Sequence, residues 1–236
     1  MKKVIHRASD RGFADHGWLK AAHSFSFGSF YNPAKSHFGL LRVLNDDIVA
    51  PGMGFGMHGH DNMEIVTIPL KGTLAHKDSL GSEGVIKYGE IQAMSAGSGL
   101  QHSEFNASAT EEVNLLQIWV FPKVRNIQPR YDQKSFDFSD LKNEFKLLVS
   151  PQQTSETMWI NQDAYFTLGS LDAGKTIEYG LNMRSNGTYL FVIEGDVEVD
   201  GERLARRDAA GVFETDKIEL TAYENSQMLL IEVPME

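Results

Sequence analysis

Residues 51–60 read Pro51-Gly52-Met53-Gly54-Phe55-Gly56-Met57-His58-Gly59-His60, so two histidines stand two positions apart behind a run of glycines. Side chains two apart on a β-strand project from the same face, and His58 and His60 can therefore present two imidazoles to one point. Farther along the chain, His102 and Glu104 repeat this spacing. Two such strands, facing each other inside a barrel, would bring four potential metal ligands together.

Three imidazoles and one carboxylate leave one or two positions open on a five- or six-coordinate metal, which suits catalysis better than a structural role. A lone His-x-His pair is a weak signal, because glycine-rich loops often carry solvated histidines. The second pair strengthens the signal, and so do the glycines before each pair, since they permit tight turns and close backbone approach at the rim of a barrel. The combination favours a metal site.

Short stretches of β-branched and aromatic residues alternate with Gly, Asn, Asp and Pro along the chain, which predicts an all-β protein. The pattern loosens between residues 121 and 151 and then resumes, so we expect two domains, at 1–135 and 136–236. The expected strands cover residues 39–44, 64–70, 73–77, 90–95 and 113–121 in the first domain, and 165–169, 177–183, 189–193, 196–199, 217–221 and 228–233 in the second.

The second half of the chain looks like the first. Leu70-Lys71-Gly72-Thr73-Leu74-Ala75 and Ile193-Glu194-Gly195-Asp196-Val197-Glu198 share one order of apolar, charged, glycine and strand residues. Two copies of one β-barrel explain the match. Chance explains it as well, because a strand, a turn and a glycine recur in any β protein, and the sequence leaves both explanations open.

Composition excludes several classes of function. The chain has no cysteine, which excludes disulfides, thiolate ligands and cysteine nucleophiles, so a metal must be held by nitrogen and oxygen. It carries 22 basic and 32 acidic residues, a net charge of −10, which argues against direct contact with nucleic acid. No apolar run approaches the roughly 18 residues of a membrane-spanning helix, and no secretory leader pattern is recognisable. We expect a cytoplasmic protein without a membrane segment.

Several longer motifs stand out along the chain. They are His16-Gly17-Trp18-Leu19, Phe25-Ser26-Phe27, Phe38 to Asp47, Pro51 to His60, Lys71 to Ser79, Met94 to Glu104 and Pro129-Arg130-Tyr131. With these motifs the chain resembles the pirin family of bicupins, densely over residues 11–136 and more weakly beyond. The resemblance implies an all-β chain of two cupin-type, jelly-roll β-barrels, the first holding a single transition metal through His58, His60, His102 and Glu104.

The carboxylate ligand has two candidates. Cupins in general take their carboxylate ligand from the first motif, and a resemblance to them would imply Glu64, which lies in the same strand phase as His60. Pirin-like proteins use the Glu of a His-Ser-Glu motif instead, which is Glu104 here. We therefore expect Glu104 as the ligand. Glu64 is either a partner that holds an imidazole proton or a strand carboxylate at the mouth of the barrel.

The second barrel, residues 136–236, is expected to contribute no ligand, because no histidine follows His102. An approximate repeat offset places apolar residues opposite the four ligands and predicts a filled core. These residues are Leu181, Met183, Leu220 and Ala222, opposite His58, His60, His102 and Glu104 respectively.

The resemblance implies a metal-dependent dioxygenase of the quercetin 2,3-dioxygenase type, which cleaves flavonols or similar enolisable aromatics with O2. Glu104 would be both a ligand and the catalytic base that takes the proton of the substrate hydroxyl. The divalent metal is expected to be iron(II), although nickel, manganese, copper, cobalt and zinc also accept these donors. We expect a monomer.

Two alternatives share the same metal site. The chain could be a pirin-like regulatory protein, a redox-sensing cofactor of a protein partner without turnover. It could also be a storage or binding bicupin that keeps its metal for stability alone, because a bound ion stabilises the native state.

Several other side chains are weaker candidates for the site. Phe55, Met57 and Met94 are placed to line its mouth, although each also fits ordinary barrel core. His16, His23 and His37 have no paired ligand partner and are expected to be structural or surface residues. His76 lies where a strand runs into a turn, and we expect it to face solvent.

Overall fold

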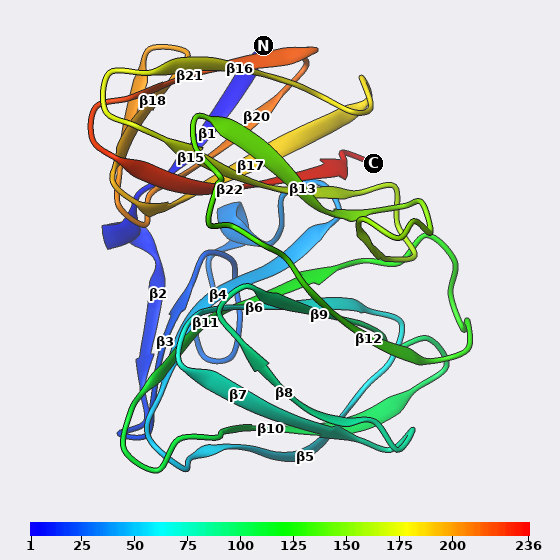
Figure 1. The fold of residues 1–236 in the computed structure, drawn as a ribbon. Coiled ribbons are helices and arrows are strands. Elements are labelled where there is room, and N and C mark those ends of the chain that lie inside the picture. The colour runs from blue at the N-terminus through cyan, green and yellow to red at the C-terminus, as the bar shows by residue number, and fades with distance from the viewer.

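The computed structural model describes residues 1–236, which form two β-sandwiches stacked on one another (Figure 1). Each sandwich pairs a seven-stranded sheet with a four-stranded sheet. The expectation of an all-β bicupin chain is confirmed, in the form of two open jelly-roll sandwiches rather than closed barrels. The only helical segments are two single 3-10 turns, η1 (Ala8–Asp10) and η2 (Pro33–Lys35), and neither could cross a membrane.

The N-terminal sandwich, blue to green in Figure 1, has the sheet orders β12-β9-β6-β11-β4-β3-β2 and β5-β10-β7-β8. Its strands are β2 (Gly12–Asp15), β3 (Leu19–His23), β4 (Leu41–Val49), β5 (Gly54–His60), β6 (Glu64–Lys71), β7 (Thr73–Asp78), β8 (Glu83–Lys87), β9 (Glu90–Ser95), β10 (Leu100–Asn106), β11 (Val113–Val120) and β12 (Arg130–Ser135).

The C-terminal sandwich has the sheet orders β1-β20-β17-β22-β15-β13-β14 and β16-β21-β18-β19. Its strands are β1 (Lys2–His6), β13 (Glu144–Ser150), β14 (Met158–Trp159), β15 (Tyr165–Leu171), β16 (Thr176–Gly180), β17 (Asn186–Glu194), β18 (Asp196–Val199), β19 (Glu202–Ala205), β20 (Ala209–Phe213), β21 (Lys217–Ala222) and β22 (Ser226–Pro234).

The two sandwiches repeat one topology. The order β9-β6-β11-β4 in one matches β20-β17-β22-β15 in the other, and β5-β10-β7-β8 matches β16-β21-β18-β19. Gly72 and Gly195 lie at the same turn, where the chain passes from the large sheet to the small one, and both are left-handed, with φ of 77° and 90°. The sequence match around these glycines therefore marks a structural repeat rather than chance.

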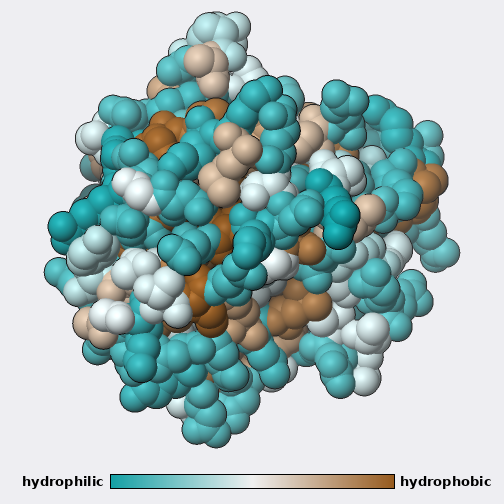
Figure 2. Space-filling model, turned by 90° about the horizontal axis from the view of Figure 1, so that it is seen from above, coloured by the Kyte–Doolittle hydropathy of each residue, from teal (hydrophilic) through white to brown (hydrophobic).

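The large sheets of the two halves pack face to face. One cluster of 26 buried hydrophobic residues draws on both, for example Val66, Leu116 and Ile118 from the first and Phe166 and Leu229 from the second. The sandwiches therefore share a core, and we expect them to unfold together. Viewed from above the C-terminal sandwich, the surface is mostly hydrophilic, with hydrophobic residues between the polar ones near its centre (Figure 2).

The first strand of the chain, β1, lies in the second sandwich and not in the first. β1 pairs with β20 and so belongs to the C-terminal sheet, while the following residues descend to the N-terminal sandwich. The division into domains 1–135 and 136–236 stays a prediction. It would place β1 in the first domain, although this strand pairs in the C-terminal sheet.

Candidate metal centre

Strands β5 and β10 of the small N-terminal sheet carry the predicted ligand pairs. They pair antiparallel with His58 directly opposite His102, and a bulge between His102 and Glu104 shifts the register beyond that point. The rings of His58, His60 and His102 gather with centroids 4.4–4.9 Å apart. The structure thus brings the three predicted imidazoles to one point inside the sandwich.

The nitrogens of these rings suit a metal cation. Nε2 of His60 lies 3.0 Å from Nε2 of His102, and Nδ1 of His58 lies 2.8 Å from the Gly56 carbonyl oxygen. That carbonyl favours a proton on Nδ1 of His58 and leaves the Nε2 lone pair free.

Burial keeps the rings of His60 and His102 neutral. Desolvation, reinforced by the neighbouring imidazoles, lowers the pKa of His60 to about 4 and that of His102 to about 2. Moreover, the buried Nδ1 of His102 has no hydrogen-bond partner. Imidazole nitrogens that converge in this way fit a shared divalent ion.

Glu104 is the predicted oxygen ligand, and it is buried. The Gln117 amide Nε2 donates to Glu104 Oε2 at 3.1 Å, and the Thr67 hydroxyl donates to Oε1 at 3.5 Å. Burial raises the pKa of Glu104 to about 7, although both hydrogen bonds oppose the shift. Ligating atoms of Glu104, His102 and His76 lie within 4.8 Å of one another, as do those of His58, His60 and His102. His102 belongs to both groups, and Glu104 lines the same cavity as His58 and His60.

The expectation that His76 faces solvent was wrong. His76 is only 2% exposed, because β7 lies between β10 and β8 and its inward face looks into the sandwich. Its ring stacks on Tyr131 with centroids 4.5 Å apart, and its Nε2 lies 3.3 Å from Asp78 Oδ2. The polar turn after Asp78 is at the surface, but His76 itself, on the strand before it, is not.

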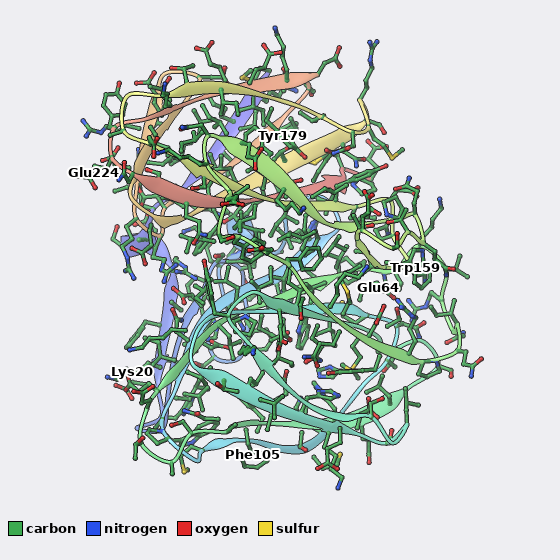
Figure 3. All side chains as sticks on the ribbon, in the orientation of Figure 1. Lys20, Glu64, Phe105, Trp159, Tyr179 and Glu224 are labelled. Carbon is green, nitrogen blue, oxygen red and sulfur yellow. The ribbon has the colours of Figure 1, made fainter.

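Glu64 makes neither of the contacts expected of it. Ser95 Oγ and the Asn161 backbone N–H donate to Glu64 Oε2 at 2.7 and 3.0 Å, and no imidazole is its partner. Figure 3 shows Glu64 near Trp159, at the junction of the two sandwiches. This carboxyl therefore links the two halves of the molecule.

A cavity of about 280 Å³ opens over the candidate ligands. Trp119 forms one wall and meets the His60 and Phe27 rings edge to face, at 4.9 and 5.3 Å between centroids. Of the three mouth residues expected, Phe55 lines the cavity, Met57 is an exposed side chain, and Met94 is core. The complete lining is Phe27, Asn45, Asp47, Phe55, His58, His60, Glu104, Gln117 and Trp119.

Five of these lining residues were not among the candidates: Phe27, Asn45, Asp47, Gln117 and Trp119. A signal for two of them lies in β4, where Asn45 and Asp47 interrupt an apolar strand at alternate positions and so share a face. A larger hollow, of about 610 Å³, lies beside Arg184, Phe213 and Met235, but no histidine lines it.

The C-terminal sandwich has apolar side chains where the N-terminal one has ligands. Tyr179 pairs with Ile218 as His58 pairs with His102, and Leu220 pairs with Val199 as Glu104 pairs with His76. Ile218, Leu220 and Val199 are fully buried. The filled core was expected, but the expected register was off by two residues: Tyr179, Leu181, Ile218 and Leu220 take the places assigned to Leu181, Met183, Leu220 and Ala222.

Comparison with known proteins points to one family along the whole chain. The family model described as Pirin matches residues 5–120, and that of the quercetinase C-terminal cupin domain matches residues 147–233. A quercetin 2,3-dioxygenase of Escherichia coli strain K12 is 37% identical over 232 residues, 98% of either chain. A pirin-like protein of Caulobacter vibrioides is 41% identical over 222 residues, 94% of this chain and 95% of the relative.

Solved structures agree. The crystal structure of the bacterial pirin YhhW in complex with nickel(II), from Escherichia coli, matches with a TM-score of 0.93 and 35% identity, and 99% of each chain is covered.

Proposed function

The chain belongs to the pirin family of bicupins, and on that premise we propose that it is a metal-dependent dioxygenase that cleaves flavonols or similar enolisable aromatics with O2. One observation carries the proposal: three imidazoles converge, and a buried carboxyl lines the same aromatic-walled cavity, which is open to solvent. Relatives named quercetin 2,3-dioxygenase, aligned over nearly the whole chain, support it.

One divalent transition metal would be held by His58, His60, His102 and Glu104. Iron(II) is the first candidate, and nickel, manganese, copper, cobalt and zinc remain compatible with a nitrogen and oxygen donor set. The nickel(II) complex of the Escherichia coli pirin makes nickel the second ion to test. When bound, the metal supplies a Lewis acid that stabilises the oxyanion of the substrate.

Glu104 is proposed as the base that takes the hydroxyl proton of the substrate. In the metal-free chain burial raises the pKa of Glu104 to about 7, whereas a bound cation favours the carboxylate, the form that accepts a proton. Gln117 and Thr67 hold the carboxyl in place by donating to its two oxygens. The chain therefore positions a proton acceptor beside the imidazole cluster without exposing it to water.

Phe27, Phe55 and Trp119 would bracket a planar substrate. Their rings line the cavity, whose volume of about 280 Å³ is just below the roughly 300–1,000 Å³ typical of small-molecule sites. A flat aromatic ring system fits such a slot better than a bulky or extended ligand.

The regulatory alternative requires the same metal site without turnover, so one experiment separates the two functions. Metal-stripped protein is reloaded separately with each of the six ions, and dioxygen uptake with quercetin is recorded beside a His58→Ala control. Uptake that depends on the metal and is absent from the control supports the dioxygenase. Bound metal with no uptake for any ion contradicts it and favours regulation.

A further inference from the structure

Asp47 is a buried carboxyl without a partner. It lies on β4 in the cavity wall and is only 5% exposed, yet its side chain forms no hydrogen bond or ion pair, and its Oδ1 is occluded without a partner. A buried polar group left unpaired destabilises the folded state. A ligand in the cavity would supply the missing partner.

The neighbouring carboxyl, by contrast, is paired. Asp46 points to the opposite face of β4, where Arg207 Nε lies 3.0 Å from its Oδ2 and Asn114 Nδ2 donates to its Oδ1 at 2.7 Å. Arg207 and Asn114 thus bind Asp46 at the interface between the sandwiches. Asp47 faces the cavity and receives neither.

The repeat shows that the fold does not need this carboxyl. Asp47 pairs with Leu115 of β11 as Gly169 pairs with Met228 of β22, so glycine stands at the equivalent place in the C-terminal sandwich. The same jelly roll therefore forms without any side chain there. What distinguishes the two positions is the cavity over the candidate ligands.

We propose that Asp47, together with Asn45 two residues before it, forms a subsite that binds a second hydroxyl group of the substrate, apart from the one that meets the metal. The proposal rests on the proposed function and narrows its substrate class to planar aromatics with at least two hydroxyl groups. Asn45 uses its Oδ1 on His23 Nδ1, at 2.9 Å, and offers its amide Nδ2 to the ligand.

The carboxyl of Asp47 can donate as well as accept at neutral pH. Burial, with smaller contributions from the charges of Asp46 and Glu104, raises its pKa to about 8. A protonated carboxyl offers one O–H donor and an acceptor oxygen. A phenol, which is likewise both donor and acceptor, complements it.

Ligand binding without oxygen tests the subsite separately from turnover. Metal-loaded wild type, Asp47→Leu and Asp47→Asn are titrated anaerobically with quercetin and with 3-hydroxyflavone, which carries only the hydroxyl that would meet the metal. We expect wild type to prefer quercetin. Asp47→Leu should weaken quercetin binding about tenfold or more, the effect of losing one good hydrogen bond, while 3-hydroxyflavone changes less than twofold. Asp47→Asn should restore part of the preference.

Thermal unfolding of the ligand-free proteins separates this role from a structural one. Removing an unpaired buried carboxyl should raise the Tm of Asp47→Leu by about 2–4 °C. A lower Tm, equal losses for both ligands, or a wild type that binds the two alike would overturn the inference. None of these results affects the oxygen-uptake test of the proposed function. Absence of oxygen uptake, in turn, does not affect the binding test.

Discussion

Replacing Glu104 by glutamine separates the charge of this carboxyl from its shape. The amide has nearly the same volume and can still hydrogen-bond Gln117 and Thr67, which contact the carboxyl now. It cannot accept a substrate proton. In the metal-loaded protein we therefore expect Glu104→Gln to keep some metal on the three histidines but to lose about 10²–10⁴ in kcat, the usual contribution of a general base.

The metal-free protein gives a second, independent magnitude. The pKa of Glu104 is about 7 in the folded state against 4.5 for the unperturbed group, because burial disfavours its charge. The carboxyl thus ionises more readily in the unfolded chain, so it lowers the free energy of unfolding as pH rises from about 4.5 to about 7. The loss is about 3 kcal/mol and is complete above pH 7.

Glutamine does not ionise and should abolish this dependence. We expect metal-free Glu104→Gln and wild type to have similar unfolding free energies at pH 4.5, and the variant to be more stable by up to about 3 kcal/mol at pH 8. Urea denaturation of both proteins at a series of pH values measures the difference. A variant that is less stable than wild type at pH 8, or that retains full oxygenase activity, would refute the assignment of a buried, proton-accepting carboxyl.

Three further predictions follow from the ligands, the shared core and the repeated turn. His102→Ala should remove bound metal and all oxygenase activity, which elemental analysis and oxygen uptake report; full metal content would contradict its place as a ligand. Leu116→Ala should cost about 2–5 kcal/mol of unfolding free energy within one cooperative transition, because its cluster spans both sandwiches; two separate transitions would show that the halves unfold independently. Gly195→Ala should cost about 1–3 kcal/mol, since the residue is left-handed and an added Cβ would meet Asn225 O at 2.7 Å; unchanged urea denaturation would contradict this.

Local periodicity was sufficient to predict the centre of the site. His58-x-His60 and His102-x-Glu104 carry their own geometry, because alternate residues on a strand share a face whatever the rest of the chain does. The glycine turns suggested the repeat but left chance open, and the sheet order decided between the two. The family resemblance then supplied the choice of Glu104 over Glu64, which spacing alone left open.

Long-range pairing was what the sequence could not predict. The cavity wall combines Phe27, β4 and β11, and their meeting depends on sheet order rather than on any local pattern. The equivalents of His58 and His60 were misplaced by two residues because the connection from β16 to β17 is longer than that from β5 to β6. His76 was misjudged for a related reason, since strand neighbours on both sides decide its burial.

The fate of labelled oxygen tests the central claim most directly. Metal-loaded protein is given quercetin under ¹⁸O₂, and the cleaved product is analysed by mass spectrometry. A dioxygenase predicts that both atoms of one oxygen molecule enter the organic product. Label recovered only in water or peroxide, or quercetin loss without incorporation, would contradict it.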